Sequence, residues 1–138
     1  MVADFVLDCS VTIAMCLKDE RSAYVERVEN ALRDASAVVP ALWPYEVANA
    51  LVMAERRRRM SPAERDELLA ILGSLGIVIE ATPAVLPRAL IALAQRHKLT
   101  AYDAAYLELA LSAGLPLATT DSDLARAAKA ARVPLFKG

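Results

Sequence analysis

The strongest constraint on the fold is an alternation, along the whole chain, of short apolar runs with longer helical segments. The apolar runs cover residues 2–7, 37–39, 77–79 and 115–119, with a last short run at 133–136. Their length and their content of valine, isoleucine and leucine are typical of strands that are buried on both faces. Strands that alternate with helices predict an α/β fold with a mainly parallel sheet of four to five short strands.

The segments between these runs carry helix signals. The clearest helix start is Ser61-Pro62-Ala63-Glu64, a capping box with proline at the first helical position. The chain has 138 residues and shows no repeat, linker or low-complexity segment, so we expect residues 1–138 to form a single domain. Helices are expected over residues 10–17, 22–35, 44–59, 61–73 (or to 76), 84–96, 101–113 and 121–131.

The cysteines and the hydropathy of the chain indicate the cellular compartment in which the protein is expected. No apolar stretch reaches the ~18 residues that a membrane span needs, and the first eight residues lack the basic start of a signal peptide. Cys9 and Cys16 form no metal-binding motif, and His97 is the only histidine, which argues against a zinc site. We therefore expect a cytoplasmic protein with free thiols and no membrane association.

Four acidic residues, unlike most acids of the chain, lie among apolar neighbours. Asp8 ends the first apolar run, Glu46 follows the second, and Asp121 follows the run at 115–119, while Asp103 begins a helix. Each by itself also fits a helix cap or a first-turn acid favoured by the helix dipole. Taken together, they predict convergence, because the carboxyl ends of parallel strands share one edge of the sheet.

Such a cluster needs cations or protons. Two carboxylates ~5 Å apart repel by ~3 kcal/mol at an effective dielectric near 20, so an empty cluster of four is costly. Carboxylate oxygens without histidine or cysteine favour Mg²⁺ or Mn²⁺. Two such ions ~4 Å apart are a common arrangement for in-line attack of water on a phosphodiester.

The same residues lie in motifs that resemble those of the PIN-domain ribonucleases, and among these the VapC toxins of bacterial and archaeal toxin–antitoxin pairs. The motifs are V-L-D-C-S-V at Asp8, Y-E-V-A-N-A-L at Glu46, L-T-A-Y-D-A-A-Y at Asp103 and L-A-T-T-D-S-D-L at Asp121. The resemblance covers essentially the whole chain. It implies a three-layer α/β/α sandwich, a Mg²⁺- or Mn²⁺-dependent endoribonuclease, a homodimer, and inhibition by a VapB-type antitoxin.

The resemblance also assigns roles to individual residues. It implies that Asp8, Glu46, Asp103 and Asp121 are the catalytic and metal-binding acids. Ser10 and Asn49 match polar residues that the family places beside the first aspartate and one turn after the glutamate. Thr120 is a further supporting candidate, and Asp123 is ambiguous, because only some members use an acid there.

The charge balance limits nucleic-acid binding less than it first suggests. The 16 Lys and Arg against 17 Asp and Glu give a formal charge of −1, which excludes a strongly basic binder. Cations bound at the four acids would leave 13 acids against these 16 bases. The run Arg56-Arg57-Arg58-Arg59 fits two readings equally: a solvated helix end, or a contact for RNA phosphates or for an acidic antitoxin segment.

Other residues are assigned simpler roles. We expect His97 to be an exposed basic residue and Glu108 to lie outside the site, about 140° from Asp103 around their helix. Tyr102 and Tyr106 are expected to contribute to packing or to a dimer seam rather than to base stacking.

Two alternative functions remain open. A haloacid-dehalogenase-like phosphatase also begins with a strand followed by D-x-D-x-T, but here the second aspartate is replaced by Ser10. A non-catalytic PIN-fold binding module would keep the fold without the chemistry, and the presence of all four acids argues against it.

Overall fold

A four-stranded parallel sheet forms the centre of the chain in a computed structural model, which describes residues 3–80 and 86–138. The strands are β1 (Phe5–Leu7), β2 (Ala37–Val39), β3 (Ile77–Ile79) and β4 (Leu117–Ala118), in the spatial order β3-β2-β1-β4. Every pairing is parallel, with Val6 opposite both Val38 and Leu117. The predicted α/β class and parallel sheet are therefore confirmed.

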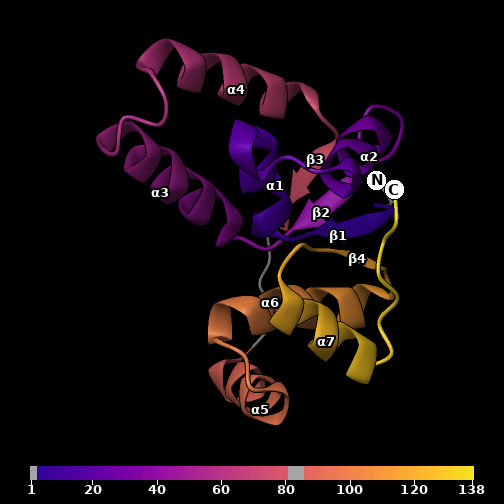
Figure 1. Ribbon diagram of the computed structural model, residues 1–138. Coiled ribbons are helices and arrows are strands. Elements are labelled where there is room, and N and C mark those ends of the chain that lie inside the picture. The colour runs from indigo at the N-terminus through magenta and orange to yellow at the C-terminus, as the bar shows by residue number, and fades with distance from the viewer. Residues whose placement is uncertain (1–2, 81–85) are drawn as a thin grey trace.

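Helices cover both faces of this sheet and make the three layers that were expected. Figure 1 shows α6 and α7 on one side, with α5 beyond α6, and α1 to α4 on the other side. In the described part of the chain, no helix is both long and apolar enough to span a membrane. The helices are α1 (Cys9–Cys16), the short 3₁₀ helix η1 (Lys18–Glu20), α2 (Ala23–Ala31), α3 (Trp43–Arg56), α4 (Pro62–Ser74), α5 (Pro87–His97), α6 (Ala101–Ala113) and α7 (Ser122–Ala130).

Helix starts follow the local sequence signals closely. The predicted capping box is present, since the Ser61 side chain accepts from the Glu64 amide and the Glu64 side chain accepts from the Ser61 amide. Thr100 and Asp121 cap α6 and α7 through their side-chain oxygens, which accept from the Asp103 and Leu124 amides. These caps are local, so the sequence alone was enough to predict them.

Several predicted boundaries differ from the structure: α2 ends at Ala31 rather than at residue 35, and β4 covers Leu117–Ala118 rather than 115–119. The run at 133–136 forms only a single parallel bridge between Leu135 and Leu117 instead of a fifth strand; Pro134, which has no N–H to donate, lies beside it. Helix α3 ends at Arg56 rather than at residue 59, because Arg58 adopts a left-handed backbone with φ 57°. Asp4 precedes β1, where its carboxylate accepts a hydrogen bond from the Ser36 amide. Two predicted starts lie outside the described residues: that of the first strand at residue 2 and that of a helix at residue 84.

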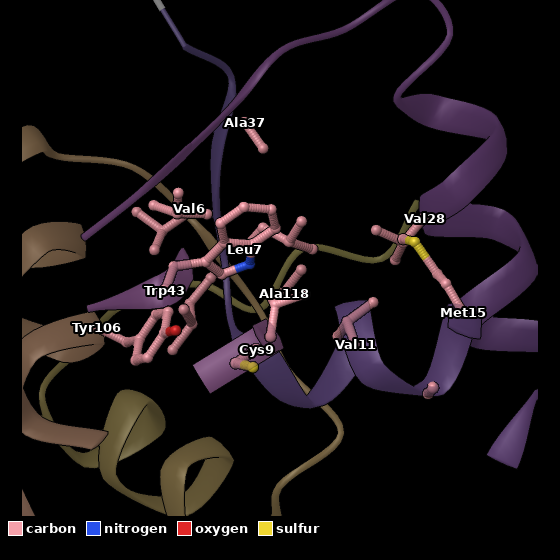
Figure 2. Packing of buried hydrophobic residues seen from close by; sticks show 14 of the residues in the cluster. Val6, Leu7, Cys9, Val11, Met15, Val28, Ala37, Trp43, Tyr106 and Ala118 are labelled. Carbon is pink, nitrogen blue, oxygen red and sulfur yellow. The ribbon is translucent and has the colours of Figure 1, made fainter. Parts of the chain in front are cut away.

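The core is built around the sheet. Phe5, Val6 and Leu7 are completely buried, as the continuous apolar run predicted. Figure 2 shows Val6 and Leu7 within a cluster that also contains Trp43 and Tyr106. Because β1 is central and packed on both faces, the residue that follows it is held at the carboxyl edge of the sheet.

Candidate active site

An open pocket of about 340 Å³ lies at the carboxyl edge of the sheet, and the four predicted acids line it together. Asp8 follows β1, Glu46 lies in the first turn of α3, Asp103 in the first turn of α6, and Asp121 follows β4. Ser10 and Asn49 line the same pocket, along with Cys9, Ile13 and Ala50. Residues separated by more than a hundred positions are therefore brought to one place by the parallel strand order.

Asp8 is the most buried of the four acids, with 3% of its surface exposed. Its Oδ2 accepts hydrogen bonds from Ser10 Oγ at 2.5 Å and from Thr119 Oγ1 at 2.8 Å. Burial raises the pKa of the Asp8 carboxyl, the two hydroxyl donors lower it in part, and the charge of Asp121 raises it further. The carboxylate is held firmly but is costly to ionise without a cation.

The same two hydroxyls connect the end of β1 and the first turn of α1 with the segment after β4. Thr119 Oγ1 accepts from the Asp121 amide at 3.0 Å, and Ser10 Oγ accepts from the Thr120 amide at 3.1 Å. The predicted residue Thr120 thus takes part through its main chain, while its side chain is exposed. Thr119, which supplies the buried hydroxyl, was missed; the only signal in the sequence was two threonines in a row before Asp121.

Glu46 is held from another helix. The buried hydroxyl of Tyr106, on α6, donates to Glu46 Oε1 at 2.6 Å. Burial raises the pKa of the Glu46 carboxyl, the hydrogen bond from Tyr106 lowers it, and the charges of Asp8 and Asp103 raise it again. The expectation that Tyr106 contributes to packing or to a dimer seam missed this contact, although its position three residues after Asp103 places both on one face of α6.

Asp103 and Asp121 complete the acidic lining. Burial raises the pKa of the Asp103 carboxyl, and the charges of Asp121 and Asp8 raise it further. Asp121 Oδ1 accepts from the Leu124 amide at 3.0 Å, so this acid is also the N-cap of α7. The two readings considered for Asp121, cap and site residue, are therefore compatible.

The donor set has the chemistry of a site for a hard divalent cation. Four carboxylates from four elements face one pocket, where burial and then repulsion between neighbouring acids raise the pKa values of Asp8, Glu46 and Asp103. As the side chains stand, no group of three or more His, Cys, Asp or Glu within residues 3–80 and 86–138 has an arrangement that could hold a metal ion. Instead Asp8, Glu46 and Asp121 use oxygens in hydrogen bonds within the protein. The residues fit such an ion in kind, and their side chains would have to rearrange to bind it.

The remaining candidates do not line the pocket, although the charge of Asp123 also contributes to the raised pKa of Asp103. Asp123 is exposed, its Oδ1 lies 3.8 Å from Nη2 of Arg126, and it is not among the residues that line the pocket. Glu108 does not line it either, as expected. His97 is half-buried rather than exposed.

The arginine run lies at the far end of α3 from Glu46. Arg56 is in its last turn, and Arg57 and Arg58 follow it with exposed side chains. Arg59 makes two hydrogen bonds, of 2.9 and 2.8 Å, to the carboxylate of Asp19 in η1. All four arginines are exposed at the surface, and of these Arg59 contacts the neighbouring helix η1 through Asp19.

The fold and the acidic pocket place the chain in a defined class. The model of the PIN domain family matches residues 5–130, and the chain belongs to this family. It is 34% identical over 122 residues to Ribonuclease VapC3 of Pyrobaculum aerophilum, covering 87% of this chain and 91% of that protein. The crystal structure of PAE2754 from the same organism matches with a TM-score of 0.70 at 26% identity, covering 92% of this chain and 87% of that one. The resemblance inferred from the motifs is confirmed.

Proposed function

We propose that this protein is a Mg²⁺- or Mn²⁺-dependent endoribonuclease and the toxin of a toxin–antitoxin pair. The observation that carries the proposal is the convergence of Asp8, Glu46, Asp103 and Asp121 in one open pocket. Membership of the PIN family and the similarity to Ribonuclease VapC3 support RNA as the substrate. We propose further that residues 1–138 act as one PIN-like domain.

The proposed reaction is hydrolysis of a phosphodiester bond, leaving a 3′-hydroxyl and a 5′-phosphate. A divalent cation held by the acids would supply an activated water and offset negative charge on the phosphate. The chain's own residues hold the acids in place: Ser10 and Thr119 bind Asp8, and Tyr106 binds Glu46. Without cations, four carboxylates in one pocket would repel an RNA phosphate, so we expect cleavage to require the cation.

The proposed partners follow from the same assignment. We propose that a VapB-type antitoxin inhibits the protein, that the protein acts in the cytoplasm, and that it forms a homodimer. We propose that the exposed arginines Arg56, Arg57 and Arg58 contact RNA or an acidic antitoxin segment. Arg59 would hold the arginine run in position through its hydrogen bond to Asp19. Failure of a small protein encoded next to this gene to co-purify and to restore growth would contradict the toxin assignment.

The decisive experiment compares cleavage of total cellular RNA by the wild type and by Asp8→Asn and Asp103→Asn, with EDTA, Mg²⁺ or Mn²⁺. We expect cation-dependent cuts with 5′-phosphate ends from the wild type, and a loss of at least about 100-fold in each variant because a ligand charge is removed. Glu108→Gln is the matched control, since it removes an acid from the same helix as Asp103 but outside the pocket.

Three results would contradict the proposal. A folded Asp8→Asn protein that cuts RNA at the wild-type rate would overturn the mechanism. Hydrolysis of small phosphate esters without RNA cleavage would favour a phosphatase, and cation binding without any hydrolysis would favour a non-catalytic binding module.

A further inference from the structure

Tyr106 is the largest completely buried side chain of the described residues, and its hydroxyl reaches an acid of the pocket. We propose that Tyr106 is a positioning residue, which orients the Glu46 carboxylate and thereby sets the affinity of the pocket for a divalent cation. The inference rests on the proposed function, because it assigns to Glu46 a role as a cation ligand.

The first argument is rigidity. The Tyr106 ring has no exposed surface and lies in the buried cluster, where Figure 2 shows its hydroxyl oxygen in red. Glu46, by contrast, is only half-buried in the first turn of α3, and a glutamate side chain has several rotatable bonds that packing alone would have to order. A hydroxyl on a completely buried ring can therefore restrict the orientation of this carboxylate.

The second argument is the use of oxygens. A phenol has one hydrogen to donate, and Tyr106 donates it to Oε1 of Glu46. This is the one hydrogen bond that Glu46 makes through its side chain among the described residues, so Oε2 remains for a ligand in the pocket. Orienting one oxygen so that the other faces the ligand is a common role for groups that contact a metal-binding carboxylate.

The third argument is topology. Tyr106 lies one helical turn after Asp103, on the face of α6 that meets the pocket. The contact spans 60 positions of sequence and links α6 to α3. Tyr106 therefore links the positions of two acids. It contacts Glu46 directly, and it lies on the same helix as Asp103.

The test measures Mn²⁺ binding to the full chain by titration calorimetry and by the electron paramagnetic resonance signal of free Mn²⁺. We expect Tyr106→Phe, which keeps the ring and removes one hydroxyl, to bind Mn²⁺ about tenfold more weakly. Tyr24→Phe is the matched control: it removes a phenol that donates at 2.7 Å to the Phe136 carbonyl, outside the pocket lining. The control is expected to bind Mn²⁺ as the wild type does, with thermal unfolding recorded for each variant.

A second pair of variants separates positioning from a general effect on folding. If Tyr106 acts through Glu46, then Tyr106→Phe weakens Mn²⁺ binding in the wild type but adds nothing in a Glu46→Ala background. Glu46→Asp keeps the charge but draws it away from the phenol, and it is expected to bind Mn²⁺ as weakly as Tyr106→Phe. This variant leaves the core intact and serves if Tyr106→Phe does not fold.

The outcomes are distinct from those of the proposed function. Unchanged Mn²⁺ affinity in Tyr106→Phe, or equal losses with and without Glu46, overturns the positioning role even if RNA is cleaved. A tenfold loss of Mn²⁺ affinity in Tyr106→Phe that is absent when Glu46 is replaced by alanine supports the positioning role, even if no RNA substrate is found. A wild type that neither binds Mn²⁺ nor cleaves RNA overturns both.

Discussion

At the scale of single residues, Asp8 shows how hydroxyl groups compensate for the loss of solvent around a carboxylate. Its side chain is almost completely buried, and Ser10 and Thr119 replace part of the water that an exposed aspartate would bind. The resemblance to the PIN family implied Ser10, which stands two residues after Asp8. Thr119 was not predicted, because its role depends on β4 pairing with β1, which the sequence does not state.

Thr119→Val provides the residue-scale prediction. It keeps the shape of the side chain but removes the hydroxyl that donates to Asp8 and accepts from the Asp121 amide. We expect Mn²⁺ affinity and RNA cleavage to fall by about 10- to 100-fold, since a group that orients a metal ligand is lost. Thr120→Val keeps its contributing main-chain amide and is expected to lose much less. A larger loss in Thr120→Val than in Thr119→Val would contradict this assignment.

At the scale of elements, helix starts were the features best predicted and least dependent on tertiary contacts, whereas α2 and α3 end before the predicted residues. Helices α5 and α6 both end in a left-handed residue, Lys98 with φ 56° and Gly114 with φ 66°. Glycine adopts this conformation without strain, whereas other residues pay a cost. Replacing the glycine at one end and introducing a glycine at the other should therefore change the stability in opposite directions.

We expect Gly114→Ala to lower the free energy of unfolding by about 1 kcal/mol and Lys98→Gly to raise it by a few tenths to about 1 kcal/mol. A Cβ at Gly114 would meet no atom within 4 Å, so the cost there is one of backbone conformation alone. Urea denaturation of both variants measures the change. Equal effects of the same sign would contradict the argument.

At the scale of the whole molecule, the acidic pocket makes stability depend on pH and on cations. The pKa values of Asp8, Glu46 and Asp103 are raised in the folded chain above their ordinary values of 3.8, 4.5 and 3.8, first by burial. Groups with raised pKa values contribute stability below the unfolded-state pKa and lose it as the pH rises through the folded-state pKa. The cation-free chain is therefore expected to lose this contribution as the pH rises above about 4, where the unfolded acids ionise first.

The measurement is a series of thermal melts in EDTA and in Mn²⁺ between acid and neutral pH. We expect Mn²⁺ to raise the melting temperature at neutral pH and to have little effect at acid pH, where protons occupy the carboxylates. Asp8→Asn removes one of the titrating groups and is expected to be less dependent on pH in EDTA than the wild type. A Mn²⁺ effect of equal size at both pH values would argue against cation binding at these acids.

The sequence by itself determined the class of fold, the helix starts and the identity of the four acids. These depend on local information: apolar runs of strand length, caps such as Ser61 and Thr100, and acids placed directly after strands or in the first turns of helices. Such signals are read within a few residues, so they need no knowledge of the spatial order of the strands.

Only the tertiary structure decided the strand order β3-β2-β1-β4 and the partners of the acids. The contacts of Glu46 with Tyr106 and of Asp8 with Thr119 join residues 60 and 111 positions apart. Their existence depends on how the helices and strands pack, and nothing in the local sequence distinguishes a tyrosine or threonine that reaches an acid from one that only fills the core. For the same reason the final run at 133–136 could be recognised as apolar, but not as a single bridge.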